Sequence, residues 1–397
     1  MWGWFEIFTM LWKFMKNDEK DYFGWKIKMK PSFIGKIISK QDRYDPNTRS
    51  GMLNRLARMN GEKSFSEKYN FDDETDLIGY KFYKLQDAQF WTNTEMNFSK
   101  DIEHYRRADP KVKRALNLIL GFFAAGDGLV TSNLVFRFIF EARSMVEMSA
   151  LIAQAHQEAI HAENYIMTIK SMIPDKEKRK ELLESVDNIQ CVKDKAILIE
   201  NYLYADLPMS YRLIAFAATE GISFWALFAV LFYFKDKKDK NGNLLFENIV
   251  SSNIQIAKDE SMHKDYGCAR YRALPMEEKL PQEITFKVLG EFADVEKRFA
   301  DKILPEPYND LNAEDIKNFI EYMTDNLCVG LGYDKLYNTD KIPEAMYWMA
   351  IGSRSDKANF YEVDVLSYKL RPLCETIHKN KDEEDNDDSS DIDETYF

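Results

Sequence analysis

Residues 157–165 read Gln-Glu-Ala-Ile-His-Ala-Glu-Asn-Tyr, and this stretch decides how the rest of the chain is interpreted. In a helix, Glu158 and His161 leave the same face about one turn apart, because they stand at positions i and i+3. Tyr165 comes four residues after His161 and joins that face on the next turn. The spacing therefore predicts a carboxylate, an imidazole and a phenol that point into one volume, whereas Glu163 points away from it.

The chain repeats this spacing and adds two further acids. Glu260 and His263 form a second Glu-x-x-His, and Glu220 and Asp127 are each the only acid in a long apolar run. Buried carboxylates are costly unless they are paired or bind a cation. Two Glu-x-x-His helices with one acid from each of two other helices are the ligand set of a dinuclear metal site in a ferritin-like bundle. We therefore predict an all-α, ferritin-like helical bundle with a dinuclear metal site inside its core, held by Asp127, Glu158, His161, Glu220, Glu260 and His263.

The ligand types narrow the choice of metal. Oxygen-rich ligation with two imidazoles and no thiolate favours iron or manganese over zinc or copper(I), and does not decide between the first two. Asp127 lies between Gly126 and Gly128, which would leave room for another group beside it. Taken alone, Asp127 has the alternative interpretation of a polar residue bonded to a neighbouring helix.

Composition and charge limit the class of protein. The chain has 397 residues, of which 45% are hydrophobic and 30% charged, as is typical of soluble globular proteins. Four scattered cysteines without CxxC spacing indicate a reducing compartment, which we expect to be the cytoplasm. The net charge of −12 comes largely from residues 381–397, with nine acids and one lysine. We therefore expect no nucleic-acid partner, and no phosphate-binding motif supports nucleotide binding by this chain alone.

The chain divides into three predicted parts: residues 1–70, an N-terminal arm or extension; residues 71–353, the ferritin-like di-iron domain; and residues 354–397, a flexible acidic tail. Residues 1–15 are rich in aromatic side chains but too short to span a bilayer, and we favour a packed helix over a partner-docking one. Helices are predicted over residues 73–91, 110–140, 144–172, 175–189, 191–206, 213–234, 245–274, 281–304 and 312–329.

Residues 213–234 contain Glu220 as their single ionisable group. Hydropathy alone would allow a transmembrane helix, but a charge near the middle is costly in lipid. A helix that is apolar all round can also be the buried centre of a large bundle, which is the prediction here, with no transmembrane segment. Phe224 and Phe228 follow Glu220 at i+4 and i+8, so we expect them to form an apolar wall of the metal pocket.

Several motifs together resemble the small, radical-generating (beta) subunit of class I ribonucleotide reductase, in its eukaryotic and viral class Ia form. The resemblance covers roughly residues 75–370. It rests on Phe-Trp-Thr at 90–92, Phe-Phe-Ala-Ala-Gly-Asp-Gly at 122–128, Glu-Ala-Ile-His-Ala-Glu-Asn-Tyr at 158–165, Phe-Ala-Ala-Thr-Glu-Gly-Ile at 216–222 and Lys-Asp-Glu-Ser-Met-His at 258–263.

The resemblance implies a function and further site residues. It implies an oxo-bridged centre of two iron ions, with manganese as the alternative, on the same six ligands. It implies that dioxygen activation leaves a stable radical on Tyr165, which passes through His161, Asp259, Trp91 and Tyr368. The recipient is a large subunit, docked by the tail ending at Phe397, which reduces ribonucleoside diphosphates to deoxyribonucleotides. The resemblance also implies a homodimer, which is the usual assembly in this family. Without the resemblance, Trp91 would be a core aromatic, and Asp259 either an orienting or a solvated acid.

Two departures from the family pattern and two alternatives remain. Lys258 stands where many eukaryotic relatives have Arg, and Lys cannot make a bidentate guanidinium contact. Asp391 replaces an aromatic residue of the familiar tail, so docking would depend on Ile392 and Tyr396 with Phe397. The alternatives are another ferritin-like di-iron oxidase or oxygenase, and a non-catalytic scaffold paralogue. Loss of ligands would mark the scaffold, and none is lost.

Overall fold

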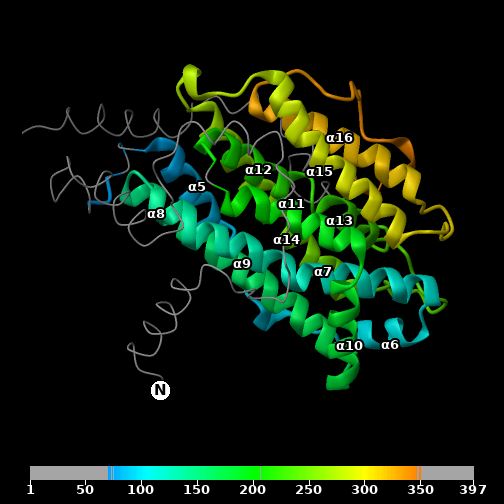
Figure 1. The fold of residues 1–397 in the computed structure, drawn as a ribbon. Coiled ribbons are helices and arrows are strands. Elements are labelled where there is room, and N and C mark those ends of the chain that lie inside the picture. The colour runs from blue at the N-terminus through cyan, green and yellow to red at the C-terminus, as the bar shows by residue number, and fades with distance from the viewer. Residues whose placement is uncertain (1–69, 73, 75, 206, 347, 350–397) are drawn as a thin grey trace, which may run out of the picture. The chain divides into compact units, whose positions relative to one another are not determined.

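The computed structural model describes residues 70–349 except residues 73, 75, 206 and 347, and these form a bundle of helices (Figure 1). In chain order the helices are α5 (Leu77–Ala88), α6 (Ser99–Arg107), α7 (Pro110–Asn133), α8 (Ile139–Glu141), α9 (Met145–Met172), α10 (Lys176–Asp187), α11 (Gln190–Tyr204), α12 (Met209–Gly221), α13 (Trp225–Phe232), α14 (Glu247–Arg272), α15 (Gln282–Ile303) and α16 (Ala313–Leu331). Shorter segments are a π-helical stretch, Leu134–Phe138, and the 3₁₀ turns Asn93–Glu95, Met276–Glu278 and Glu344–Met346. The predicted all-α fold is confirmed.

The centre of the bundle is built from four helices that pack in pairs. Helix α7 packs on α9, and α12 packs on α14, while α5 covers α9 and α15 packs on α16 (Figure 1). The four central helices are the ones that carry the acids singled out from the sequence. The first and last of these four helices, α7 and α14, are separated by more than 110 residues in the chain.

Local sequence explains where the long helices begin. Asp109 caps α7, because its side chain accepts a hydrogen bond from the amide of Lys111, and Pro110 occupies the first helical position. Ser144 caps α9 by accepting from the amide of Glu147 over 3.0 Å. The predicted starts near residues 110 and 144 are therefore confirmed.

The apolar segment 213–234 is not one continuous helix. Helix α12 ends at Gly221 and α13 begins at Trp225. The amides of Ile222 and Ser223 both bond the carbonyl of Ala218, and the amide of Leu227 bonds the carbonyl of Phe224, so the regular ladder is interrupted. The prediction of an unbroken helix is wrong, because the sequence holds no proline that would mark the interruption.

The same segment is buried inside the protein. Two helical stretches, Pro110–Glu141 and Met209–Phe232, have the length and apolar composition of a membrane span. The apolar window of Met209–Phe232 is entirely buried in the bundle, as expected for a central helix of a large helical domain. The interpretation of residues 213–234 as the buried centre is confirmed.

Candidate metal centre

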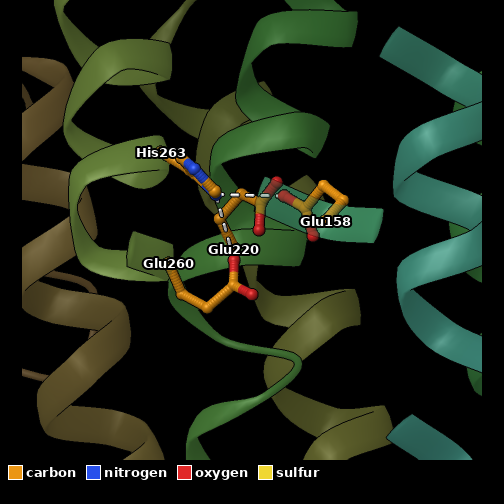
Figure 2. Close-up of side chains that lie close together, drawn as sticks. All are labelled: Glu158, Glu220, Glu260 and His263. Atoms are coloured by element: carbon orange, nitrogen blue, oxygen red, sulfur yellow. Dashed lines mark hydrogen bonds and ion pairs between the residues drawn. The ribbon is translucent and has the colours of Figure 1, made fainter. Parts of the chain in front are cut away.

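Six side chains from the four central helices converge in the core. Helix α7 carries Asp127, α9 carries Glu158 and His161, α12 carries Glu220, and α14 carries the pair Glu260 and His263. They form two overlapping groups whose ligand atoms lie within 4.8 Å of one another: Glu158, Glu220, Glu260 and His263 in one, and Asp127, Glu158 and His161 in the other. Figure 2 shows the first group, with side chains from α9, α12 and α14 pointing toward one another.

Two of the carboxylates lie between the two imidazoles. Glu158 has one oxygen 3.0 Å from Nδ1 of His263 and the other 3.5 Å from Nδ1 of His161. Glu260 is placed in the same way, 3.3 Å from Nδ1 of His263 and 3.0 Å from Nδ1 of His161. Each of these carboxylates could therefore bridge two cations, while Asp127 and Glu220 stand at the opposite ends of the cluster.

The donor set fits a pair of divalent cations. All six side chains are at most 1% exposed. One oxygen each of Asp127 and Glu220, and both oxygens of Glu158, have no hydrogen-bond partner among the described residues. Such groups are costly to bury without a counter-charge. Two divalent cations would balance the four carboxylates, and oxygen and imidazole donors suit iron or manganese.

Burial and the neighbouring charges shift the pKa values of several groups in the cluster. Burial and the neighbouring acids raise the pKa of Asp127 and of Glu220 well above their usual values. Burial alone would lower the pKa of His263, but Glu158 and Glu260 beside it raise that pKa to about 9. Burial works against ionisation of Glu260 as well, but hydrogen bonds from the two histidines lower its pKa. Metal binding would have to displace the protons held by the groups whose pKa is raised.

Tyr165 lies in a buried, apolar part of the same core. Its side chain is 0% exposed, and its hydroxyl has no hydrogen-bond partner among the described residues. The ring stacks on Phe123, with centroids 4.4 Å apart and an interplanar angle of 1°. Burial, with Asp127 as the strongest of the charged neighbours, raises the pKa of Tyr165 well above its usual value, so the phenol is neutral.

The two phenylalanines expected near this pocket contact the ring that stacks on Tyr165. Phe224 and Phe228 pack on Phe123, with ring centroids 5.7 Å and 5.2 Å away. They do so across the break between α12 and α13 and not along one helix, so the i+4 and i+8 argument is wrong in its geometry. Phe224 also packs closely over Gly126, where a Cβ would lie 3.3 Å from the Phe224 ring. The glycine therefore leaves room for a wall residue, beside Asp127.

A chain of contacts links the cluster to Trp91. The indole Nε1–H of Trp91 donates to Oδ2 of Asp259 over 2.8 Å, and the same oxygen lies 3.0 Å from Nε2 of His161. The rings of Trp91 and His161 are nearly parallel, at 6.0 Å. Trp91 is half-buried, whereas Asp259 is 1% exposed. Because Nε2 of His161 faces Asp259, Nδ1 is left to face the carboxylates.

Gln157 is a member of the site that reasoning from the sequence missed. Its amide donates to Oδ1 of Asp259 over 3.3 Å, and its oxygen lies 2.9 Å from Nε2 of His263. It therefore orients the second histidine as Asp259 orients the first. The sequence did contain a signal for Gln157. One face of α9 carries a stripe of polar residues, whereas the buried face of an ordinary helix carries apolar ones. The stripe consists of Gln154, Gln157, Glu158, His161, Asn164, Tyr165 and Thr168.

The remaining predicted residues lie apart from the cluster. His156, the other histidine of α9, is exposed and stacks on Phe90. Glu163 is exposed and accepts a hydrogen bond from Asn93. Lys258 is half-buried on α14, next to Asp259. Tyr368 and Phe397, with Ile392 and Tyr396, lie outside the described residues.

Comparison with known proteins settles the family. Residues 70–344 match the sequence model of the family described as ribonucleotide reductase, small chain. The chain belongs to this family. The ribonucleoside-diphosphate reductase small chain of Plasmodium falciparum (isolate Dd2) is 31% identical over 333 residues, which cover 84% of this chain and 91% of the relative. The corresponding small chain of Vaccinia virus (strain Ankara) is 32% identical over 317 residues, covering 79% and 93%.

Solved structures agree with the fold. The ribonucleotide reductase Rnr4 homodimer from Saccharomyces cerevisiae matches with a TM-score of 0.64 and 26% identity, over 75% of this chain and 92% of that one. A dimanganese(II) NrdF from Streptococcus sanguinis matches with a TM-score of 0.62 and 20% identity, over 72% and 98%. The ferritin-like fold is thereby confirmed. As a ribonucleotide reductase small chain, the protein acts with a large subunit in an oxidoreductase that makes deoxyribonucleotides.

Proposed function

We propose that this small chain uses two iron ions, held by the six clustered side chains, to generate a tyrosyl radical on Tyr165. The observation that carries the proposal is the position of Tyr165, which is fully buried, without a hydrogen-bond partner among the described residues, and one helical turn from His161. Iron bound there would supply the oxidising equivalent, by activating dioxygen. Manganese is the alternative, because the donor set suits both metals.

The side chains around Tyr165 have separate roles in this proposal. Asp127 acts most strongly among the charged neighbours on the phenol and raises its pKa, so it keeps Tyr165 neutral before oxidation. Phe123, Phe224 and Phe228 exclude water from the ring, which protects a radical from reduction. The four carboxylates hold the cations and keep the cluster neutral once two divalent ions are bound.

The radical would leave the core along the contacts that end at Trp91. The stacked rings of Trp91 and His161, joined through Asp259, support an electron path to the half-buried indole. Asp259 Oδ2 would accept hydrogen bonds from the N–H of Trp91 and from Nε2–H of His161, and so hold the two rings in place. We infer that Tyr368 continues the path and that the tail ending at Phe397 docks on the large subunit. A peptide of residues 389–397 should then compete for the large subunit, and a peptide without Phe397 should not.

Assembly and compartment follow from simpler observations. The Saccharomyces cerevisiae structure is described as a homodimer, and we propose the same state here, which light scattering at twice 46.6 kDa would support. Cys191, Cys268 and Cys328 are free, which supports a reducing compartment, proposed to be the cytoplasm.

The test is anaerobic loading with ferrous iron followed by oxygen, read by electron paramagnetic resonance and visible absorption on one sample. We expect a tyrosyl signal in the wild-type chain. Tyr165→Phe should bind the same amount of iron and give no tyrosyl signal, because the hydroxyl makes no hydrogen bond that positions a ligand. Iron uptake without a radical in the wild-type chain would favour a di-iron oxygenase. Absence of metal uptake would favour a scaffold.

A further inference from the structure

Lys195 and Glu296 form an ion pair in the core that the proposed chemistry does not use. Lys195 lies on α11 and Glu296 on α15, and the ammonium is 2.6 Å from the carboxylate. Both side chains are 1% exposed. Taking two charges out of water is expensive, and apolar residues of similar volume often stabilise such a site as well or better. A buried pair of this kind is therefore more readily explained by the geometry it imposes than by its contribution to stability.

The pair lies at the interruption between α12 and α13. The ammonium of Lys195 donates a hydrogen bond to the carbonyl of Ser223. That carbonyl has no place in the helix ladder, because the amide of Leu227 bonds the carbonyl of Phe224 instead. A buried carbonyl without a partner costs free energy, and Lys195 removes that cost at this one position.

The surroundings of Lys195 hold its ammonium in one place. The Nζ atom lies 4.0 Å from the ring centroid of Phe122 and 4.8 Å from that of Phe299. These two rings pack on each other at 5.5 Å. The ammonium is thus enclosed by two aromatic faces, a carboxylate and a carbonyl. Phe122 comes from α7, Glu296 and Phe299 come from α15, and Ser223 lies between α12 and α13. Burial raises the pKa of Glu296 to about 7, against the opposing effects of Lys195 and the amide of Ala226.

The interruption matters because of what stands on each side of it. Glu220 is the penultimate residue of α12, and its carbonyl accepts a hydrogen bond from Nε1 of Trp225 over 3.0 Å. Phe224 immediately follows Ser223 and packs on Phe123, which stacks on Tyr165. A shift of Ser223 would therefore move a carboxylate of the cluster and the apolar wall together.

We propose that Lys195 and Glu296 are positioning residues that hold the interruption between α12 and α13, so that Glu220 faces the metal cluster and Phe224 covers the Tyr165 pocket. The effect on the radical rests on the proposed function of Tyr165, whereas the effect on the backbone does not. The two parts are therefore tested separately.

The first test uses the full chain without metal. The variant Lys195→Met/Glu296→Leu removes both charges and leaves no lone buried ion. We expect amides of residues 219–228 to exchange with deuterium at least about tenfold faster than in the wild type. The control, Arg212→Met/Glu141→Leu, removes a less buried ion pair at the opposite end of α12, where Arg212 bonds both oxygens of Glu141. The Glu141 side chain is 12% exposed and also lies 3.8 Å from Arg137. Unchanged exchange at 219–228, or an equal increase in the control, would overturn the proposal.

The second test loads iron and oxygen into the same variants. The double variant should show a severalfold shorter half-life of the tyrosyl signal per bound iron, and the Arg212 control should not. A wild-type half-life in the double variant, or an equal shortening in the Arg212 control, would overturn the positioning role. A wild-type chain without any tyrosyl signal would instead contradict the proposed function, and deuterium exchange would still decide whether the pair holds the interruption.

Discussion

Gln157 connects the two histidines of the cluster, bonding His263 directly and reaching His161 through Asp259. It accepts from Nε2 of His263 and donates to Asp259, which in turn faces Nε2 of His161. Each imidazole is thereby held with Nδ1 toward the carboxylates. Partners of this kind determine which tautomer a metal-binding histidine adopts and how basic it is.

Replacing Gln157 with Leu should therefore weaken metal binding although all six side chains of the cluster remain. We expect the affinity for ferrous or manganous ions to fall about 10- to 100-fold. The measurement is a metal titration of the apoprotein. Gln86→Leu is the matched control, because Gln86 is equally buried but bonds the carbonyls of Phe82 and Ala150. Equal metal affinity in Gln157→Leu and Gln86→Leu would contradict this role.

Trp91 allows a second prediction about a single residue. Trp91→Phe keeps an aromatic ring beside His161 but loses the N–H that bonds Asp259. We expect the tyrosyl radical to form normally, while nucleotide reduction with the large subunit falls at least about 100-fold, because a displaced reacting group loses about that much. Phe90→Leu alters the exposed neighbouring ring and should keep full turnover. Normal turnover in Trp91→Phe would remove Trp91 from the path.

Among the helices, α14 depends on a carboxylate from another helix for its start. Asp101 of α6 is 0% exposed and accepts from the amides of Asn248 and Ile249 over 3.1 Å and 3.2 Å. Burial outweighs these hydrogen bonds and raises the pKa of Asp101 to about 6. The folded state therefore binds the proton more tightly than the unfolded state does.

This shift gives a pH dependence with a definite sign. The stabilisation from the protonated Asp101 is complete below its unfolded pKa, near 3.8, and is lost as the pH rises through about 6. Asp101→Asn stays neutral and can still accept from the α14 amides. Its melting temperature relative to the wild type should rise between pH 5 and pH 7.5, by the equivalent of at most about 3 kcal/mol. A difference independent of pH would show that the carboxyl is not titrating there.

Helices were the features that the sequence predicted best, and the interruption between α12 and α13 is the exception. The predicted helix over residues 144–172 begins and ends where α9 does, because Ser144 and the polar stripe are local features. The interruption at residues 222–224 was not predicted. There the carbonyl of Ser223 has no partner in the helix ladder and accepts a hydrogen bond from Lys195, which is 28 residues away in the chain. Nothing in the sequence near Ser223 indicates that contact.

For the whole molecule, metal binding should act as a cross-link between four helices. The cluster draws on α7, α9, α12 and α14, and the pKa values of Asp127, Glu220 and His263 are raised, which favours their protonated forms. Binding should therefore release protons and stabilise the native state. The stabilisation should reach about 2.7 kcal/mol at a free metal concentration of 100 Kd.

Calorimetry in two buffers of different ionisation enthalpy measures the released protons, and thermal unfolding measures the stabilisation. Both effects should be much smaller in Glu158→Gln, because Glu158 belongs to both halves of the cluster. Metal binding without proton release at pH 7 would show that Asp127, Glu220 and His263 do not carry protons that the metal must displace.

Spacing along the chain was enough to predict most of the helices, the buried character of residues 213–234 and the grouping of Glu158 with His161 and of Glu260 with His263. These depend on spacing within one helix, which places residues three or four apart on one face. That the six side chains bind metal stays a prediction, although they lie together. Three features were visible only in the tertiary structure: the hydrogen bonds of Gln157 to Asp259 and His263, the interruption of the helix after Gly221, and the hydrogen bond from Lys195 to Ser223. Each depends on which distant segments meet in the core, because a buried polar group takes the partner that packing brings to it.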